Sequence, residues 1–300
     1  MKTIITHPGF DYMKEELLKD SEIQVCDRQW EYFDDGEPNF RINEQNGEIE
    51  YQDVTYIGDF SKTSKFFENY AAIRAILDGI PNKVRVIVPY FPVGTMERAE
   101  KKGEAVTAKY FADLISSLPS GRDMKTSIHH LDLHNPVIKH YYDASKVNPE
   151  LHTAMSLIKE KITAETNIIF PDEGAYKRFR RYFEGYNLII CEKRKENGIK
   201  TVRVKEGEAI GDHGIVIDDL GLSGGTLMKC GDATRAIGIK TCDAYVTHGS
   251  FPGESHEEIA NIFDTLYTTD SIPKNIDRAK NISNMEVLRI ATLIQKIISK

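Results

Sequence analysis

Two adjacent carboxylates followed by a loop of small residues carry the clearest chemistry in this sequence. Residues 215–226 read Ile-Val-Ile-Asp-Asp-Leu-Gly-Leu-Ser-Gly-Gly-Thr. The apolar start predicts a buried strand with Asp218 and Asp219 at its carboxyl end, the edge where open α/β sheets bind ligands. Loop and helix-start N–H groups can hold a phosphate, and the carboxylates can bind ribose hydroxyls or a metal. The glycine spacing fits neither the P-loop nor the dinucleotide fingerprint; the alternative is a plain glycine-rich turn.

A second candidate is the histidine-rich segment 129–134, His-His-Leu-Asp-Leu-His. Alternation places its leucines on one face of a predicted strand, and Asp132 and His134 on the other face near the strand end. A histidine and a carboxylate there could hold Mg²⁺ with a nucleotide phosphate. The spacing of His130 and His134 suits zinc only on a helix, so we expect His129 and His130 to be structural.

Two further segments place charges after predicted strands. Asp172 and Glu173 open a predicted helix, either beside a substrate or as ordinary partners of the helix dipole. The cationic stretch 191–198 follows another strand, where a mobile basic loop could neutralise a transferring phosphoryl group. The alternative for that stretch is a solvated hairpin tip.

Two weaker candidates combine aromatic, acidic and basic groups. In residues 32–37, Tyr-Phe-Asp-Asp-Gly-Glu, an aromatic face beside carboxylates could stack a base and accept from its amino group. Alone, that segment reads only as a turn. Arg98 lies in a predicted loop after a strand, where its guanidinium could bind a phosphate.

Short apolar runs alternate with longer amphipathic segments, and this order predicts an α/β protein with parallel sheets flanked by helices. A Ser-x-x-Glu capping box at 283–286 predicts the start of a C-terminal helix, packed on a domain or on a partner subunit. Strands are expected at 84–88, 127–133, 167–170, 187–191, 214–217 and 241–247. Helices are expected over about 104–118 and 172–183, and from the glycine-rich turn to about Ile237.

Length and charge narrow the class of protein. The chain has 300 residues, which suggests two domains, and the polar stretch 143–150 is the best boundary between domains 1–147 and 148–300. The net charge of −7 argues against uniform binding to nucleic acid. Residues 176–205 nevertheless carry ten Lys/Arg and three Asp/Glu, and such a local positive region suits a small anionic ligand.

The cysteines and the hydropathy predict an intracellular protein. Cys26, Cys191, Cys230 and Cys242 are far apart in the sequence and form no Cys-x-x-Cys pair, so we expect reduced thiols. The first ten residues show no signal-peptide core, and no apolar run approaches the roughly 20 residues of a membrane helix. The expected location is the cytoplasm.

Taken together, the motifs resemble the ribose-phosphate diphosphokinases, also called phosphoribosyl pyrophosphate synthetases. Six motifs in the family's order cover roughly residues 32–252, and segments 94–98, 172–175, 223–226 and 245–249 look like the plant-like class II branch. The six motifs are Phe33-Asp34-Asp35-Gly36-Glu37, Pro89-Tyr90-Phe91-Pro92, Asp132-Leu133-His134, Pro171-Asp172-Glu173-Gly174, Lys193-Arg194-Lys195 and Ile217-Asp218-Asp219.

The resemblance implies two tandem phosphoribosyltransferase type I-like domains, with ATP on the N-terminal side and ribose phosphate on the C-terminal side. The implied reaction transfers diphosphate from Mg·ATP to the anomeric hydroxyl of ribose 5-phosphate and releases AMP. The ribose 1-oxygen attacks the β-phosphorus in line, while the protein positions two anions and neutralises developing charge. The resemblance further implies Mg²⁺, a homo-oligomer with shared active sites, and neither nucleic-acid nor membrane partners.

The resemblance assigns the nucleotide to residues of the N-terminal half. Phe33, Asp35 and Glu37 would hold adenine, supplied by a neighbouring subunit. Arg98 and His134 would contact the ATP phosphates and Mg²⁺, and Arg98 would also serve catalysis.

The second substrate falls to the C-terminal half. By resemblance, Asp172 would lie beside that substrate or its metal, and Lys193 and Lys195 would act in a catalytic loop. Asp218 and Asp219 would bind ribose hydroxyls. The residues that would bind the 5-phosphate are Leu222, Ser223, Gly224, Gly225 and Thr226.

Departures from the commoner class I pattern leave the acceptor open. Thr95-Met96 replaces an Arg-Gln pair, Leu222-Ser223 replaces Asp-Thr in the phosphate loop, and Lys195 replaces the usual arginine. Losing an acidic residue from the phosphate loop could admit a 5-substituted ribose such as ADP-ribose. Two further alternatives are a non-catalytic regulatory relative and a phosphoribosyltransferase that consumes the activated sugar.

Overall fold

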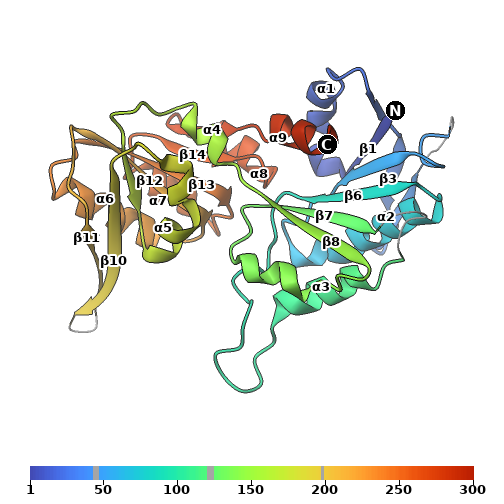
Figure 1. Ribbon diagram of the computed structural model, residues 1–300, viewed down its shortest axis with the longest axis horizontal. Helices are drawn as coiled ribbons and strands as arrows, with labels where there is room; N and C mark the ends of the chain where they lie inside the picture. Colours follow the sequence, from blue (N-terminus) through green and yellow to red (C-terminus); the bar gives the residue numbers. More distant parts are fainter. Residues whose placement is uncertain (43–46, 120–124, 197–198) are drawn as a thin grey trace. The chain divides into compact units, whose positions relative to one another are not determined.

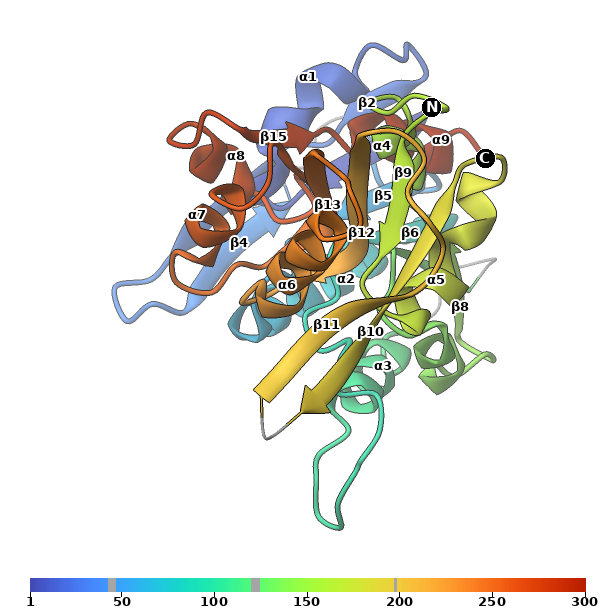
Figure 2. The ribbon, with the colours of Figure 1, turned by 90° about the vertical axis from the view of Figure 1, so that its left-hand side faces the viewer.

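The computed structural model describes residues 1–42, 47–119, 125–196 and 199–300, which form two compact units (Figures 1 and 2). The first unit comprises residues 1–152 and 291–300, and the second comprises residues 153–290. The strands are β1 (Lys2–Thr6), β2 (Ile23–Val25), β3 (Arg28–Tyr32), β4 (Pro38–Ile42), β5 (Asp53–Ile57), β6 (Lys83–Val88), β7 (Thr126–Leu131), β8 (Val147–His152), β9 (Asn167–Phe170), β10 (Leu188–Glu196), β11 (Ile199–Glu206), β12 (His213–Gly221), β13 (Thr241–Gly249), β14 (Leu266–Thr269) and β15 (Met285–Leu288). The α-helices are α1 (Lys14–Leu17), α2 (Phe66–Asp78), α3 (Thr107–Ser116), α4 (Met155–Lys159), α5 (Glu173–Phe179), α6 (Gly225–Arg235), α7 (Ser255–Ala260), α8 (Lys274–Ala279) and α9 (Ala291–Ile298).

A parallel sheet organises the first unit. Its strands run in the order β2-β1-β5-β6-β7-β8, and every adjacent pair is parallel. Helices α2 and α3 pack on one face through Ile73, Ile76 and Phe111, which join Val84 and Val86 of β6 in one core. A separate antiparallel hairpin, β3–β4, packs Trp30 and Phe40 against this core.

A second sheet, of order β11-β10-β9-β12-β13-β14-β15, organises the second unit, and all its pairs are parallel except β10–β11. The alternation of β12 explains why both faces are covered. Ile215 and Ile217 pack with residues of α4 and α5, whereas Val216 packs with residues of α6 and α7. The predicted α/β class is confirmed, and the topology brings the carboxyl ends of β9 and β12 to one edge.

The boundary between the units differs from the prediction at 147/148. Residues 147–152 form β8, an edge strand that pairs with β7 from Val147↔Thr126 to His152↔Leu131. The stretch is polar because an edge strand exposes one side to water, and an edge also tolerates Pro149. The polar stretch thus corresponds to an edge strand of the sheet and not to a linker between the units. The chain leaves the first unit only after His152.

The C-terminal segment also differs from the prediction. Residues 285–288 form β15 beside β14, with Met285 and Leu288 buried, so the Ser283 capping box does not start a helix. Strand pairing satisfies the backbone there, and the helix begins only at Ala291. That helix, α9, packs in the first unit, where Gln295 Nε2 donates to the carbonyl of Glu16 at 2.9 Å.

Among the residues that the structure describes, no helix combines the length and the apolar character needed to cross a membrane. All four cysteines are buried, and none of them forms a disulfide bond. Two of them, Cys191 on β10 and Cys230 on α6, bring their sulfur atoms to 3.2 Å although they are far apart in the sequence. Burial raises the pKa of the Cys242 thiol to about 11, so that group is protonated at neutral pH.

Candidate active site

The two carboxylates of β12 lie where the sequence predicts them, near the carboxyl end of a buried strand. Asp219 is 1% exposed, and its Oδ2 pairs with Nη1 of Arg178 at 2.8 Å. Asp218 accepts from the backbone N of Asp219 at 2.9 Å. Burial, and then the neighbouring Asp219, raise the pKa of Asp218 well above its usual value, while Arg178 opposes that rise. Arg178 therefore acts electrostatically on both adjacent carboxyl groups.

The small-residue loop after β12 turns directly into helix α6. Gly224 has φ +74°, a left-handed conformation that favours glycine. A Cβ on Gly224 would also collide with the side chain of Ile259. Leu222 and Ser223 are exposed, and Ser255 Oγ donates to the carbonyl of Leu222 at 3.0 Å. The first N–H groups of α6 thus lie beside an open loop, which is a geometry suited to an anion.

Gly224→Ala should destabilise the protein by about 2–4 kcal/mol, because it adds left-handed backbone strain to overpacking against Ile259. Urea unfolding measures this loss. Gly225→Ala is the matched control, since a Cβ there would meet nothing within 4 Å. Equal losses in the two variants would contradict the assigned role of Gly224.

Asp172 holds the start of α5 and one lysine of the basic stretch. Its Oδ1 accepts from the backbone N of Ala175 at 3.0 Å, and its Oδ2 pairs with Nζ of Lys193 at 3.0 Å. Burial by itself raises the pKa of Asp172, but the hydrogen bond from Ala175 and the Lys193 charge outweigh it and hold the pKa below its usual value. Asp172 is therefore ionised at neutral pH. The predicted helix from 172 to 183 ends at Phe179 and continues as a 3₁₀ helix.

The basic stretch 191–198 was predicted to be a mobile loop. In the structure, residues 191–196 belong to strand β10. Its residues continue β10, which pairs with β11 in an antiparallel ribbon, with Lys193 opposite Val202. Lys193 keeps 54% of its side chain exposed. Lys195 lies opposite Lys200 in the ladder. The side chain of Lys195 and residues 197–198 lie outside the described part of the structure. The antiparallel pairing of β10 with β11 agrees with the alternative prediction of a hairpin, and it extends β10 beyond the predicted end at Cys191.

In the first unit, two loops at the carboxyl end of the sheet come together. The predicted strand 127–133 ends at Leu131, because Asp132 turns out of it with φ +37°. His134 is therefore in a loop, half-buried. A Cβ on Gly94 would lie 3.1 Å from Cβ of His134, so the loop that carries Arg98 contacts the His134 loop. Arg98 itself is 72% exposed and has Glu100 within 3.7 Å.

The two preceding histidines, His129 and His130, are both buried in strand β7. His130 is buried and bonds to the hydroxyl of Tyr142 at 2.9 Å. Burial, together with the charge of His152, lowers the pKa of His130 to about 3. Burial likewise lowers the pKa of His129 to about 3. Both imidazoles are neutral at physiological pH.

The aromatic and acidic segment 32–37 forms the tip of the β3–β4 hairpin. The backbone N of Phe33 donates to the carbonyl of Glu37 at 2.9 Å, and Asp35 accepts from the backbone N of Glu37 at 3.1 Å. Phe33 is 56% exposed. An aromatic ring and two carboxylates are therefore presented to solvent on a closed turn.

Two supporting groups were not recognised from the sequence. Glu68 on α2 accepts from Tyr32 at 2.7 Å and lies 3.1 Å from His7 Nε2, which ties the hairpin to the sheet. Burial raises the pKa of Glu68, but the bonds from His7 and Tyr32 outweigh it and lower that pKa. The second supporting group is Arg178. In the sequence it is one of several basic residues on a predicted helix, and only the fold shows that it forms an ion pair with Asp219.

The candidate residues thus form one group in each unit. The first unit brings together the loops of Arg98 and His134 and carries the hairpin tip. The second unit brings Asp218, Asp219 and the loop 222–226 to the same sheet edge as Asp172. Carboxylates, a loop suited to an anion and the exposed cations Lys193 and Arg98 together suit a sugar phosphate and a phosphoryl donor.

Comparison with known proteins agrees with this class of site. Residues 3–118 match the family model described as the N-terminal domain of ribose phosphate pyrophosphokinase. Ribose-phosphate pyrophosphokinase 3, mitochondrial, of Spinacia oleracea is 33% identical over 284 residues, or 90% of this chain and 69% of the relative. Ribose-phosphate pyrophosphokinase 4 of Arabidopsis thaliana is 33% identical and covers 87% of this chain and 81% of the relative.

A solved structure shows the same fold. The phosphoribosylpyrophosphate synthetase of Mycobacterium smegmatis aligns with a TM-score of 0.82 at 20% identity, covering 99% of this chain and 97% of that one. The chain belongs to the ribose-phosphate pyrophosphokinase family. The expected likeness to the plant branch is confirmed, since plant members are among these relatives.

Proposed function

We propose that this protein transfers diphosphate from ATP to the anomeric hydroxyl of ribose 5-phosphate, forming phosphoribosyl diphosphate and AMP. The observation that carries the proposal is the Asp218–Asp219 pair followed by the Gly224 turn at the carboxyl end of β12. In a member of this family, that edge suits a ribose ring next to its 5-phosphate. The backbone N–H groups of Leu222, Ser223, Gly224, Gly225 and Thr226 would bind the 5-phosphate.

The nucleotide would bind to residues of the first unit. Arg98 is exposed, with Glu97 at 4.0 Å and Glu100 at 3.7 Å, and His134 lies in the adjoining loop. Arg98 would leave these carboxylates to contact the ATP phosphates. Phe33 would stack on adenine, with Asp35 and Glu37 as acceptors for its amino group. Because the hairpin tip faces solvent, we expect it to serve the site of a neighbouring subunit, which would make a homo-oligomer the active form.

The donor set fits Mg²⁺ at Asp172 better than at His134. Mg²⁺ prefers oxygen ligands and binds through one or two carboxylates together with substrate phosphates, and Asp172 is an ionised carboxylate. Its Oδ2 now pairs with Lys193, so this lysine would release Asp172 when the ion binds and would become available to the phosphates. His134 would contact a phosphate oxygen. The bound ion would neutralise phosphate charge, and Lys193, Lys195 and Arg98 would stabilise the charge of the transferring group.

A second acceptor is favoured by one observation. Leu222 exposes 45% of its surface in the phosphate loop, where an acidic residue would repel an extended polyphosphate. The first alternative is therefore the same diphosphate transfer with ADP-ribose as the acceptor. The second alternative is a regulatory relative without activity. We expect the protein to act in the cytoplasm, with no nucleic-acid or membrane partner.

An AMP-release assay tests the proposal. Mg·ATP is supplied with either ribose 5-phosphate or ADP-ribose, beside a Lys193→Ala control. AMP formation with ribose 5-phosphate that the control abolishes is the expected result. AMP formation with ADP-ribose alone would reassign the acceptor, and no AMP with either would contradict the enzyme and favour the regulatory alternative.

A further inference from the structure

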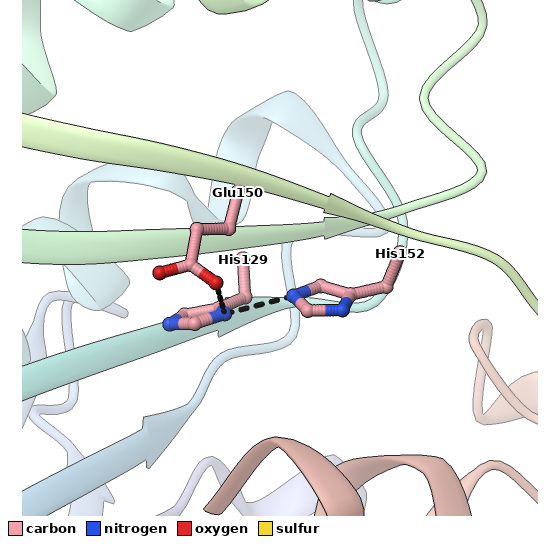
Figure 3. Close-up of side chains that lie close together, drawn as sticks. All are labelled: His129, Glu150 and His152. Atoms are coloured by element: carbon pink, nitrogen blue, oxygen red, sulfur yellow. Dashed lines mark hydrogen bonds and ion pairs between the residues drawn. The ribbon is translucent and has the colours of Figure 1, made fainter. Parts of the chain in front are cut away.

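Three potential metal ligands meet on strands β7 and β8, apart from the residues assigned to substrates. They are His129, Glu150 and His152, whose ligand atoms all lie within 4.8 Å of one another (Figure 3). His129 Nδ1 is 2.9 Å from His152 Nε2 and 3.7 Å from Glu150 Oε2. We propose that this cluster is a binding site for a divalent transition-metal ion, of which Zn²⁺ is the best fit.

Strand register explains why the three side chains meet. His129 lies directly opposite Glu150 in the parallel pair, and His152 is two residues beyond Glu150 on β8. Side chains two residues apart on a strand lie on the same face, so Glu150 and His152 share the face of His129. The arrangement is thus built into the sheet and does not depend on a loop.

The distances suit a tetrahedral ion with modest movement. Two nitrogens bound to Zn²⁺ at about 2.0–2.1 Å in tetrahedral geometry lie roughly 3.3 Å apart. The two imidazole nitrogens, at 2.9 Å, need to separate by only a few tenths of an ångström. The rings of His129 and His152 are already stacked, 20° from parallel. Glu150, with 44% of its side chain exposed, would complete a three-residue site open to water.

A hydrogen bond behind the cluster fixes the His129 ring. His129 Nε2 lies 3.0 Å from Ser127 Oγ, and that hydroxyl donates to the carbonyl of Val84 at 3.4 Å. The serine oxygen therefore accepts from Nε2–H, which leaves a lone pair on Nδ1 directed at the cluster. Such a bond to the outer nitrogen is typical of metal-bound histidine, where it fixes both tautomer and orientation. Without metal, His152 Nε2–H donates to that lone pair. On metal binding, His152 would change tautomer, with its proton on Nδ1, so that its Nε2 and His129 Nδ1 both offer a lone pair to the ion.

The donor atoms of the cluster discriminate between classes of metal. Glu150 is the single carboxylate of the three ligands, which disfavours Mg²⁺ or Ca²⁺, because these ions need several oxygen ligands. The charges of Lys83 and Arg85, which act on His129, and of Lys300, which acts on His152, oppose all divalent ions alike. Two imidazoles and one carboxylate instead form a donor set that Zn²⁺ binds through nitrogen.

The position of the cluster at the end of β8 would let a bound ion stabilise the turn at Asp132. His152 is the last residue of β8, and its carbonyl accepts from the backbone N of Asp132 at 2.9 Å. Asp132 is the residue whose positive φ turns the chain toward His134. An ion that joins β7 to the end of β8 would hold this turn in place. It would act as a structural metal beside the proposed nucleotide loop and would not take part in the transfer.

A second group, Glu254, His256 and Glu257 at the start of α7, also brings its ligand atoms together. It offers one imidazole and two exposed carboxylates on neighbouring positions. It lacks the second nitrogen ligand, so transition metals should prefer the β7–β8 cluster. Metal binding at this second group is the competing outcome that the Glu254→Gln variant tests.

Metal titration of the full-length, untagged and chelator-treated chain tests the site. Zn²⁺ binding is measured by calorimetry and Co²⁺ binding by its visible absorption, both with millimolar Mg²⁺ present to occupy magnesium sites. We expect one tight site per chain and a rise of the melting temperature on binding. His152→Gln and Glu150→Gln should each weaken binding about 100-fold or more, and Ser127→Ala should weaken it about tenfold.

Matched variants keep the test decisive. His140→Gln removes an exposed histidine from the same unit and should leave binding unchanged. Glu254→Gln should also have no effect, and a loss of the tight site in that variant would overturn the proposal. So would the absence of saturable Zn²⁺ or Co²⁺ binding, or equal affinity in His152→Gln and the unaltered chain. Glu150 is half-exposed, so its variant reports on binding even if His152→Gln folds poorly.

Discussion

Lys193→Ala should lower the rate of AMP formation about 10²–10³-fold while leaving the protein folded, because a cation that stabilises transition-state charge is worth this much. Lys193 pairs with Asp172 at 3.0 Å, and the two side chains are 54% and 38% exposed. Exposed pairs contribute about 0–1 kcal/mol to stability, so the melting temperature should scarcely change. Initial rates at saturating ATP and ribose 5-phosphate, read beside thermal unfolding, separate the two effects.

Two neighbouring substitutions control this result. Lys205→Ala removes a cation from the adjacent strand, where Lys205 pairs with Glu173, and should keep most of the activity. Lys193→Arg keeps the charge and should retain more activity than Lys193→Ala. If Lys205→Ala lost as much activity as Lys193→Ala, the general positive charge of the ribbon, and not this position, would explain the effect.

The sequence was sufficient to predict the strand, turn and helix around Asp218 and Asp219, because their signal is local. An apolar run, two aspartates and a glycine-rich turn occupy consecutive positions, and a strand followed by a helix needs no distant partner to be recognised. Gly224 illustrates this: its φ of +74° agrees with a turn that the residue types alone predict. Asp172 was similarly visible as an acidic residue at a helix start, and it is the N-cap of α5.

Features that depend on pairing between distant segments were not predictable. Residues 285–288 form a strand because β14 lies beside them. The local pattern there favoured a helix, and the free energy of completing a sheet prevailed. The cluster of His129, Glu150 and His152 has the same origin, since only strand register brings 129 opposite 150.

The ion pair of Arg178 with Asp219 is the other feature that only the fold reveals, and it predicts a large loss of stability. Arg178→Met should lower the free energy of unfolding by about 3–5 kcal/mol at neutral pH, the usual cost of leaving one charge of a buried pair without its partner. Asp219 is 1% exposed, so water cannot replace the guanidinium. Urea unfolding measures the loss, with Arg181→Met, an exposed arginine of the same segment, as the control.

The pH dependence of the Arg178→Met variant identifies the cause of that loss. Burial and the neighbouring Asp219 raise the pKa of Asp218 above 3.8 in the folded state, so the folded chain binds a proton more tightly than the unfolded chain. Such a group favours the folded state at low pH, and its contribution falls as pH rises from about 4 through the folded pKa. Without Arg178, no guanidinium offsets the negative charge of the carboxyl pair, so the loss of unfolding free energy in the variant should shrink on acidification from neutral pH toward pH 4.

Adding Asp219→Asn to Arg178→Met should restore much of the stability at neutral pH, because it removes the buried charge. A deficit that stays constant with pH and persists in the double variant would assign the loss to packing of the arginine side chain and not to its charge.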